Sequence, residues 1–286
     1  MNVKNVAGRL LFCLFGLLFL NNVSFAQADD DDDDPYESKS YLMGGLNYLS
    51  NNVFMGRHDS VVVPYITPYL GYHHASGVYA KALLAYANGK NNNRIDNFTL
   101  DLGYEHSFGN LNSGINAEKY FYNKNSRSVR ANVAFSASAY AQYANKIVQP
   151  QVAIDFNKNK NSSDYYIGLS LDHEFKMLDT RLKLIPTFTF NLGTQNYYDE
   201  YFKARALKND KTLKLKNLVS NASVLKPLDY EFSLKCELRL KSWLFTLTPT
   251  YVIPLNPAQI TIPNQNREVS EALSNTFFVE LDICKR

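Results

Sequence analysis

The feature that most constrains the fold of this chain is an alternation of apolar and polar residues with a period of two, which recurs beyond Lys39. The clearest copy spans 97–105, and similar copies span 165–175 and 230–240. In the first copy, the apolar face consists of Phe98, Leu100, Leu102 and Tyr104. Successive side chains of a β-strand point to opposite faces, so this pattern predicts strands with one oily face and one wet face.

Twelve segments show the pattern, at 41–50, 61–73, 77–88, 95–108, 113–123, 128–143, 147–157, 164–176, 180–197, 228–241, 243–254 and 275–284. Short connections alternate with mostly longer ones along the chain. This alternation is typical of a transmembrane barrel with short turns at one rim, long loops at the other, and both termini at the short-turn rim. We therefore predict an all-β fold, a single antiparallel up-and-down β-barrel at 40–286 with about 12 strands (10–14).

Aromatic residues are expected at both edges of the oily face if it contacts lipid, because their rings favour the membrane interface. The long-loop edge would hold Phe98, Phe121, Phe156, Tyr165, Tyr230, Tyr251 and Phe277, and the short-turn edge Phe108, Tyr143, Phe175 and Trp243. Phe98 and Phe108 are ten residues apart, which corresponds to roughly 25 Å of height for a strand tilted by about 40°. This matches the apolar band of a membrane barrel.

The N-terminal segment has the composition of a secretory signal peptide. Lys4 and Arg9 precede an apolar stretch at 10–20, and Ala26 ends a small-x-small cleavage pattern. We predict a cleaved signal peptide at 1–26, followed at 27–39 by a disordered acidic segment that contains six consecutive aspartates.

Charge and cysteine content exclude several other classes of protein. Without Lys4 and Arg9, 28 of the 30 basic residues remain beside 27 acidic ones, a net charge of +1 that gives no reason to expect a nucleic-acid partner. Two cysteines beyond the signal peptide, Cys236 and Cys284, are too few for a disulfide framework. No His/Cys cluster has metal-site spacing, so we expect neither a metal nor a cofactor.

The chain beyond the signal peptide resembles the outer membrane β-barrel (porin-like) proteins of Gram-negative bacteria. The segment from Ser274 to Ile283 is similar to the closing strand of that family, although the chain ends in Cys284, Lys285 and Arg286 rather than an aromatic residue. The resemblance implies insertion in the outer membrane, with lipid, lipopolysaccharide and the barrel assembly machinery as partners.

Two features conflict with a regular barrel. Pro64, Pro68, Pro150, Pro186 and Pro249 fall within predicted strands, where bulges or offset strand ends must accommodate the missing N–H groups. Glu118 is followed directly by Lys119, so one of these two charges must point toward lipid unless the register slips or the lysine reaches the rim.

The polar face predicts a lumen that is net acidic. With Glu118 left out, nine acids face five bases on the inward side. The candidate lining residues are Asp101, Glu105, Arg130, Asp155, Asp172, Glu174, Lys183, Glu231, Lys235, Glu237, Arg239 and Glu280, joined by Lys81 and Asp282. A barrel of this size has a backbone diameter of roughly 24 Å, which leaves about 10 Å inside the side chains.

Three functions remain open on these grounds. The first is a narrow channel for small hydrophilic solutes with mild cation preference, to which a structural barrel plugged by salt bridges is the alternative. The second is a hydrolase that uses a His-x-Ser pair, either His74 with Ser76 or His58 with Ser60. The first pair falls in a predicted turn and the second in a predicted loop, where such residues are common, so we expect no enzyme.

The third function is binding at the cell surface through the loop at 199–227, whose net charge of +4 would suit lipopolysaccharide phosphates. The external basic residues are Lys203, Arg205, Lys208, Lys211, Lys214 and Lys216. Leucine and lysine alternate at 213–216, which predicts a hairpin in this loop.

Overall fold

The computed structural model describes residues 39–58, 62–89, 93–126, 128, 130–209, 218–262 and 267–286. The predicted signal peptide at 1–26 and nearly all of the predicted acidic segment at 27–39 lie outside these residues.

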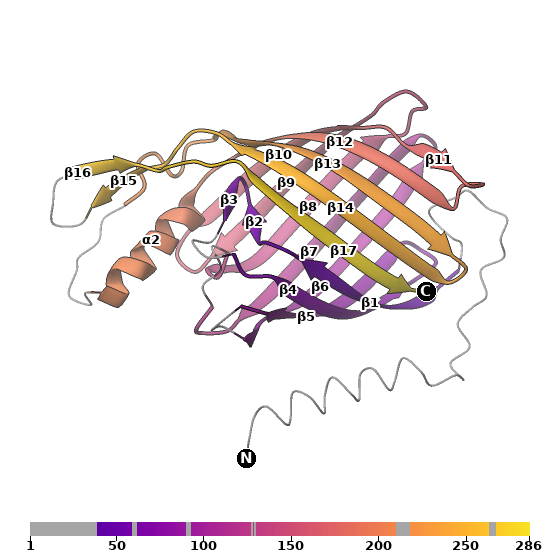
Figure 1. Ribbon diagram of the computed structural model, residues 1–286, viewed down its shortest axis with the longest axis horizontal. Coiled ribbons are helices and arrows are strands. Elements are labelled where there is room, and N and C mark those ends of the chain that lie inside the picture. The colour runs from indigo at the N-terminus through magenta and orange to yellow at the C-terminus, as the bar shows by residue number, and fades with distance from the viewer. Residues whose placement is uncertain are drawn as a thin grey trace, which may run out of the picture. The chain divides into compact units, whose positions relative to one another are not determined.

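Twelve antiparallel strands form a closed ring (Figure 1). They are β1 (Tyr41–Leu49), β4 (Tyr65–His73), β5 (Val78–Ala87), β6 (Arg94–Phe108), β7 (Leu111–Tyr122), β8 (Val133–Tyr143), β9 (Gln149–Asn159), β10 (Ser163–Asp172), β12 (Leu182–Gly193), β13 (Lys226–Leu240), β14 (Trp243–Pro254) and β17 (Thr276–Lys285). Each strand pairs with the next one in the ring, and β1 pairs with β17 to close it. The short strand β11 (Phe175–Met177) pairs with β12 alone.

The outer surface of the ring is apolar. Along β6, for example, Leu100, Leu102 and Tyr104 are exposed on the outer side, whereas the alternate residues Thr99 and Asp101 are buried on the inner side. Each of the twelve strands of the ring pairs with a strand on both sides, so the ring has no open edge, as a lipid environment requires. An oily outer face around a polar inner face is the architecture of an outer membrane β-barrel. The chain has this architecture, as the sequence pattern predicted.

The aromatic edges of the oily face also form as predicted. At the long-loop rim, the register pairs Phe98 with Phe121 and Phe156 with Tyr165, and the ring centroids of these pairs lie 5.9 and 5.4 Å apart. At the short-turn rim, the exposed side chains include Phe108, Tyr143, Phe175 and Trp243. Rings at both heights are suited to the two interfaces of the bilayer.

The prolines lie where the strand ladder is interrupted or ends. Pro68 in β4 and Pro249 in β14 lie in gaps in the pairing with β5 and β13, respectively. Pro150 lies just beyond the last residue of β9 that pairs with β8, and Pro186 lies beyond the part of β12 that pairs with β10. Pro64 precedes β4. The missing N–H groups therefore leave no ladder partner unsatisfied.

The short turns use glycines where the backbone demands them. Gly77, in the turn between β4 and β5, has a φ of 90°, and a Cβ built on it would lie 2.0 Å from the carbonyl oxygen of Glu105. A side chain is excluded there both by the backbone conformation and by the space.

Four predicted boundaries were wrong. The strand predicted at 61–73 begins at Tyr65. The strand predicted at 180–197 ends at Gly193 and is followed by the helix α2 (Asn196–Asn209). The strand predicted at 128–143 begins at Val133, so Arg130 lies in a turn. The strand predicted at 164–176 is broken after Asp172, and its last residues form β11.

Helix α2 begins where it does because a strand residue caps it. Asp164 of β10 accepts hydrogen bonds from the backbone N–H groups of Asn196 and Tyr197, at 2.7 and 2.8 Å, and from the Thr194 hydroxyl at 2.6 Å. The first N–H groups of a helix have no partner within it, so a buried carboxylate at this position stabilises the first turn.

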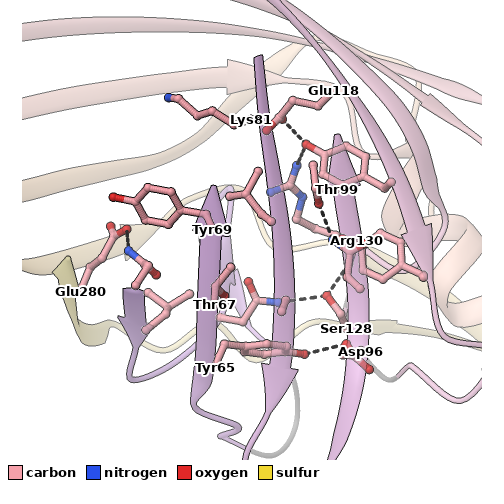
Figure 2. Close-up of a pocket in the computed structure, with 18 of the residues that line it drawn as sticks. Tyr65, Thr67, Tyr69, Lys81, Asp96, Thr99, Glu118, Ser128, Arg130 and Glu280 are labelled. Atoms are coloured by element: carbon pink, nitrogen blue, oxygen red, sulfur yellow. Dashed lines mark hydrogen bonds between the residues drawn. The ribbon is translucent and has the colours of Figure 1, made fainter. Parts of the chain in front are cut away.

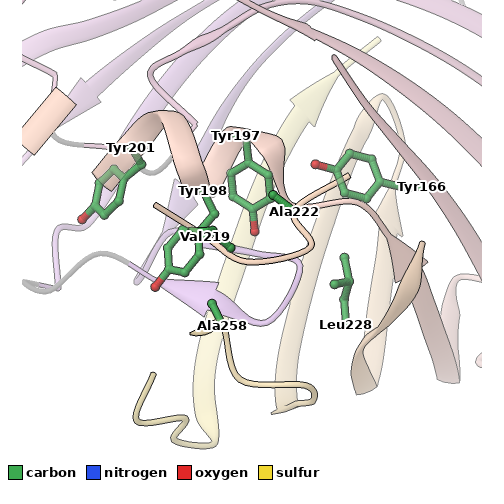
Figure 3. Packing of buried hydrophobic residues seen from close by; sticks show 8 residues of the cluster. All are labelled: Tyr166, Tyr197, Tyr198, Tyr201, Val219, Ala222, Leu228 and Ala258. Carbon is green, nitrogen blue, oxygen red and sulfur yellow. The ribbon is translucent and has the colours of Figure 1, made fainter. Parts of the chain in front are cut away.

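An apolar cluster packs the long loops together at this rim (Figure 3). Its buried members are Tyr166, Tyr197, Tyr198, Tyr201, Val219, Ala222, Leu228 and Ala258. Phe54, in the small hairpin of β2 (Val53–Phe54) and β3 (Arg57–His58), packs against the cluster. A second hairpin, β15 (Gln259–Ile262) with β16 (Arg267–Ser270), belongs to the connection between β14 and β17. Among the described residues, no helix combines the length and apolarity needed to cross a membrane.

Arg57 fastens the first hairpin to this cluster. It is 2% exposed, and its guanidinium donates hydrogen bonds to the carbonyl oxygens of Met55, Leu228, Leu255 and Asn256, at 2.9 to 3.2 Å, and pairs with Glu271 at 3.4 Å. A buried guanidinium needs such partners because its desolvation is costly. The connection between β1 and β4 is therefore held at the top of β13 and β14, across the mouth of the ring.

Candidate functional site

A cavity of about 450 Å³ lies inside the ring (Figure 2). Its wall is formed by β1, β4, β5, β6, β7 and β17, and Asn52, Ser128 and Arg130 from two long connections form its outer end. The lining includes Asn47, Tyr65, Thr67, Tyr69, Lys81, Asp96, Asn97, Thr99, Glu118, Tyr120, Tyr122, Glu280 and Asp282.

Most carboxylates of this cavity are hydrogen-bonded to neutral groups. Glu280 accepts from the Asn47 amide at 2.6 Å, and Asp282 accepts from the Tyr69 hydroxyl at 2.9 Å. Glu118 accepts from the Tyr120 hydroxyl. These partners orient the carboxylates without cancelling their charge, so the wall presents negative charge to the cavity.

Asp96 differs from these carboxylates because it lies in an ion pair. Arg94 contacts it at 2.6 Å, and the Tyr65 hydroxyl donates to its second oxygen at 2.9 Å. The cations that line the cavity are Lys81 and Arg130.

Arg130 reaches the cavity from the turn between β7 and β8. Its Nη2 donates to the Tyr120 hydroxyl at 2.9 Å, and its guanidinium carbon lies 4.6 Å from the centre of the Phe54 ring and 5.2 Å from that of Tyr120. Burial alone would lower the pKa of Arg130, but Tyr120, Tyr122 and Glu118 raise the pKa by more, so the side chain stays protonated.

Four inward tyrosines lie over glycines of the neighbouring strand. The register places Tyr69 opposite Gly45, Tyr79 opposite Gly103, Tyr140 opposite Gly114 and Tyr166 opposite Gly193. A Cβ built on any of these glycines would lie 2.3 to 2.5 Å from the tyrosine ring. The absence of a glycine side chain therefore lets each ring lie flat against the wall.

The predicted lining residues that lie on strands have inward parity in the register, and they fall into two groups. In the first group, Asp101 of β6 lies between Lys81 and Glu118 in the register, and Glu105 lies further along the same strand. Lys81, Glu118 and Glu280 of β17 line the cavity, whereas Asp101 and Glu105 do not. Arg130 joins this group from its turn.

The second group lines the opposite wall and contains two ion pairs. Glu174 contacts Lys183 at 3.3 Å, and Lys235 contacts Glu237 at 2.9 Å. Asp172 accepts from the Gln142 amide at 2.8 Å. The remaining predicted residues of this wall are Asp155 of β9 and Glu231 and Arg239 of β13.

The structure resolves the conflict at Glu118 and Lys119. Glu118 faces inward, opposite Asp101 and Ser136, and belongs to the lining from which the sequence prediction omitted it. Lys119 is exposed on the outer face beside Leu100, three residues before the end of β7, within reach of the long-loop rim.

Sequence reasoning missed the neutral part of the lining. Tyr69 and Tyr120 hold the carboxylates, and Asn52 and Ser128 join two loops through a 2.9 Å hydrogen bond. The tyrosines could have been found from the inward parity of their strands, whereas the loop contacts depend on how the connections fold.

A second cavity, of about 470 Å³, lies outward of the first, between the β7–β8 connection and α2. Its lining includes Lys124, Asn132, Lys160, Tyr201 and Ala204. Tyr120, Tyr122 and Ser128 line both cavities. These three residues therefore form the partition between the outer and inner cavities.

His74 and Ser76, the first His-x-Ser pair, line neither of these cavities. His74 and Ser76 occupy the exposed turn between β4 and β5, where Nδ1 of the histidine lies 2.9 Å from the serine hydroxyl and accepts the Ser76 backbone N–H at 3.1 Å. Both contacts are local to the turn. His58 ends β3, but Ser60 lies outside the described residues.

The external basic residues are described only in part. Lys203 lies on α2 and pairs with Asp199 at 2.6 Å. Arg205 and Lys208 belong to the same helix, but their side chains lie outside the described part, as do Lys211, Lys214, Lys216 and the hairpin predicted at 213–216. Within the residues that the structure describes, no group of three or more His, Cys, Asp or Glu side chains could hold a metal ion.

No protein-family model and no curated protein matches the chain. Among solved structures, the KdgM porin has 7% identity and a TM-score of 0.44, with 85% of this chain and 98% of that chain covered. The NanC porin has 8% identity and a TM-score of 0.45, with 86% of this chain and 99% of that chain covered. An outer membrane channel from Pseudomonas putida F1 has 10% identity and a TM-score of 0.46, with 90% of this chain and 99% of that chain covered. Since these scores are low, the fold assignment rests on the strand pairing itself.

Proposed function

We propose that this outer membrane β-barrel is a narrow channel for small hydrophilic solutes with a mild preference for cations. The observation that supports this most directly is the polar cavity of about 450 Å³ inside the ring, whose carboxylates are held mainly by neutral hydrogen-bond donors. A narrow cavity with a net acidic lining attracts small cations, admits neutral polar solutes and repels anions.

The alternative is a barrel whose lumen is plugged. Two observations favour it: the ion pairs on the β11–β13 side, and the first hairpin, which Arg57 holds across the mouth. Ion pairs and a loop can fill a lumen as well as line it. The distribution of charge supports the channel, because Glu118, Glu280 and Asp282 of the cavity wall are bonded to neutral groups, and of the described carboxylates of the cavity only Asp96 lies in an ion pair.

Planar-bilayer recording of the purified, folded protein tests the proposal. We expect discrete single-channel steps, and under a KCl gradient a reversal potential on the cation-selective side. A triple variant with Glu118, Glu280 and Asp282 changed to Gln, Gln and Asn should conduct with reduced cation preference, since these amides keep the size but lose the charge. Folded protein that inserts but gives no steps would support the plugged barrel instead.

We propose no enzymatic activity. The His74–Ser76 pair is engaged within its own turn and lies apart from both cavities. Purified protein that hydrolyses a lipid ester, and loses this activity in Ser76→Ala, would contradict this part of the proposal. Binding of lipopolysaccharide by the basic segment and recognition by the assembly machinery stay predictions from the sequence.

A further inference from the structure

The two cavities suggest a path into the barrel that is offset from its axis. The outer cavity lies beside α2, and only Tyr120, Tyr122 and Ser128 line both it and the inner cavity. A solute that enters through the outer cavity would therefore cross this partition before it reaches the acidic wall formed by Glu118, Glu280 and Asp282.

Arg130 lies directly behind the partition. Its guanidinium is bonded to Tyr120, one of the shared residues, and stacks between the rings of Tyr120 and Phe54. The backbone N–H of Arg130 bonds to the hydroxyl of Ser128 at 3.2 Å, and Asn52 of the first connection bonds to the same hydroxyl. These contacts fix a positive charge at one position rather than on a mobile side chain (Figure 2).

The charge of Arg130 is only partly compensated. Glu118 is reached through the Tyr120 hydroxyl, and Nε of Arg130 is buried without a hydrogen-bond partner among the described residues. Arg130 also lines the inner cavity, so its positive charge acts on a solute there and attracts an anionic group. The opposite effect is expected for a cation, which the fixed charge repels.

We propose that Arg130 determines the charge selectivity of the path between the two cavities, and so limits the cation preference that the acidic wall would otherwise impose. This inference rests on the proposed channel function. The path then favours neutral polar and zwitterionic solutes over free cations. Arg130 attracts the anionic group of a zwitterion, while the acidic wall attracts its cationic group.

Reversal-potential measurements on single variants test the inference. A unit charge about 5 Å from the path changes the local concentration of a monovalent ion roughly fourfold in water. Loss of this charge should raise the local cation concentration and lower the local anion concentration by that factor each, so we expect Arg130→Gln to raise the cation-to-anion permeability ratio about sixteenfold in dilute KCl. The effect should be smaller in molar salt because of screening. Arg130→Lys keeps the charge and should retain most of the wild-type ratio. Lys146→Gln, which removes an exposed charge between β8 and β9, should leave the ratio unchanged.

The possible outcomes separate this inference from the function on which it rests. A wild-type protein that does not conduct would overturn both. A conducting wild type whose permeability ratio is the same as that of Arg130→Gln would overturn the selectivity role alone. A ratio that changes equally in Arg130→Gln and Arg130→Lys would assign Arg130 to loop packing, which also contradicts the inference.

Discussion

At the residue scale, the inward glycines are required by the tyrosines that face them. Gly103 lies opposite Tyr79, and a Cβ on it would lie 2.3 Å from the tyrosine ring, so the ring or the strand must move in Gly103→Ala. We expect a loss of about 1–3 kcal/mol in unfolding free energy, the usual cost of overpacking. The measurement is the fraction of heat-modifiable, compact protein on gels across a urea series.

Gly168 provides the matched control for this prediction. It lies on β10, and a Cβ there would meet its nearest atom, the side-chain oxygen of Asn191, at 3.3 Å. Gly168→Ala should therefore shift the urea midpoint little. Equal shifts for the two variants would show that the tyrosine contact does not limit packing.

At the element scale, the strands were predictable and the connections were not. Apolar and polar residues alternate strictly at 97–105 because one face of this strand contacts lipid and the other faces the lumen. The pattern is therefore visible in the sequence. The charges of the lining followed from the same parity, including Asp101 and Glu280. Parity did not predict the position of Arg130, because it lies in a turn and not on the predicted strand, and it reaches the cavity from there.

Helix α2 escaped prediction because its stabilising partners are distant in sequence. Its cap is Asp164, about thirty residues earlier, and its apolar contacts include Val219 and Leu228 from the chain that follows. Tyr197, Tyr198 and Tyr201 were the local signal, since the first and last are four residues apart and lie on one helical face. Sequence periodicity over so short a segment does not separate this arrangement from a basic loop.

The cap offers a test of this element. Asp164→Ala removes the acceptor of two helix N–H groups and of the Thr194 hydroxyl, and we expect α2 to lose about 1–2 kcal/mol. Limited proteolysis should then cleave within 196–209 faster than in the wild type, while the gel mobility of the folded barrel stays unchanged. Unchanged cleavage would show that the apolar cluster alone holds the helix.

At the scale of the whole molecule, the fold follows from one requirement. A sheet in lipid must leave no edge, and the ring satisfies this by pairing β1 with β17. Polar groups that would be costly in lipid are thereby collected inside, where they can serve a channel. The proposed function depends on this separation of the two faces.

Spin labelling along β6 tests this central claim most directly. In a variant with Cys236 and Cys284 changed to Ser, single cysteines at Thr99, Leu100, Asp101 and Leu102 would each carry a nitroxide label in liposomes. The account predicts strict alternation: labels at 100 and 102 are accessible to oxygen dissolved in lipid, and labels at 99 and 101 to a water-soluble nickel chelate or to neither reagent. If the nickel chelate reaches all four positions equally, the chain does not span the bilayer as described.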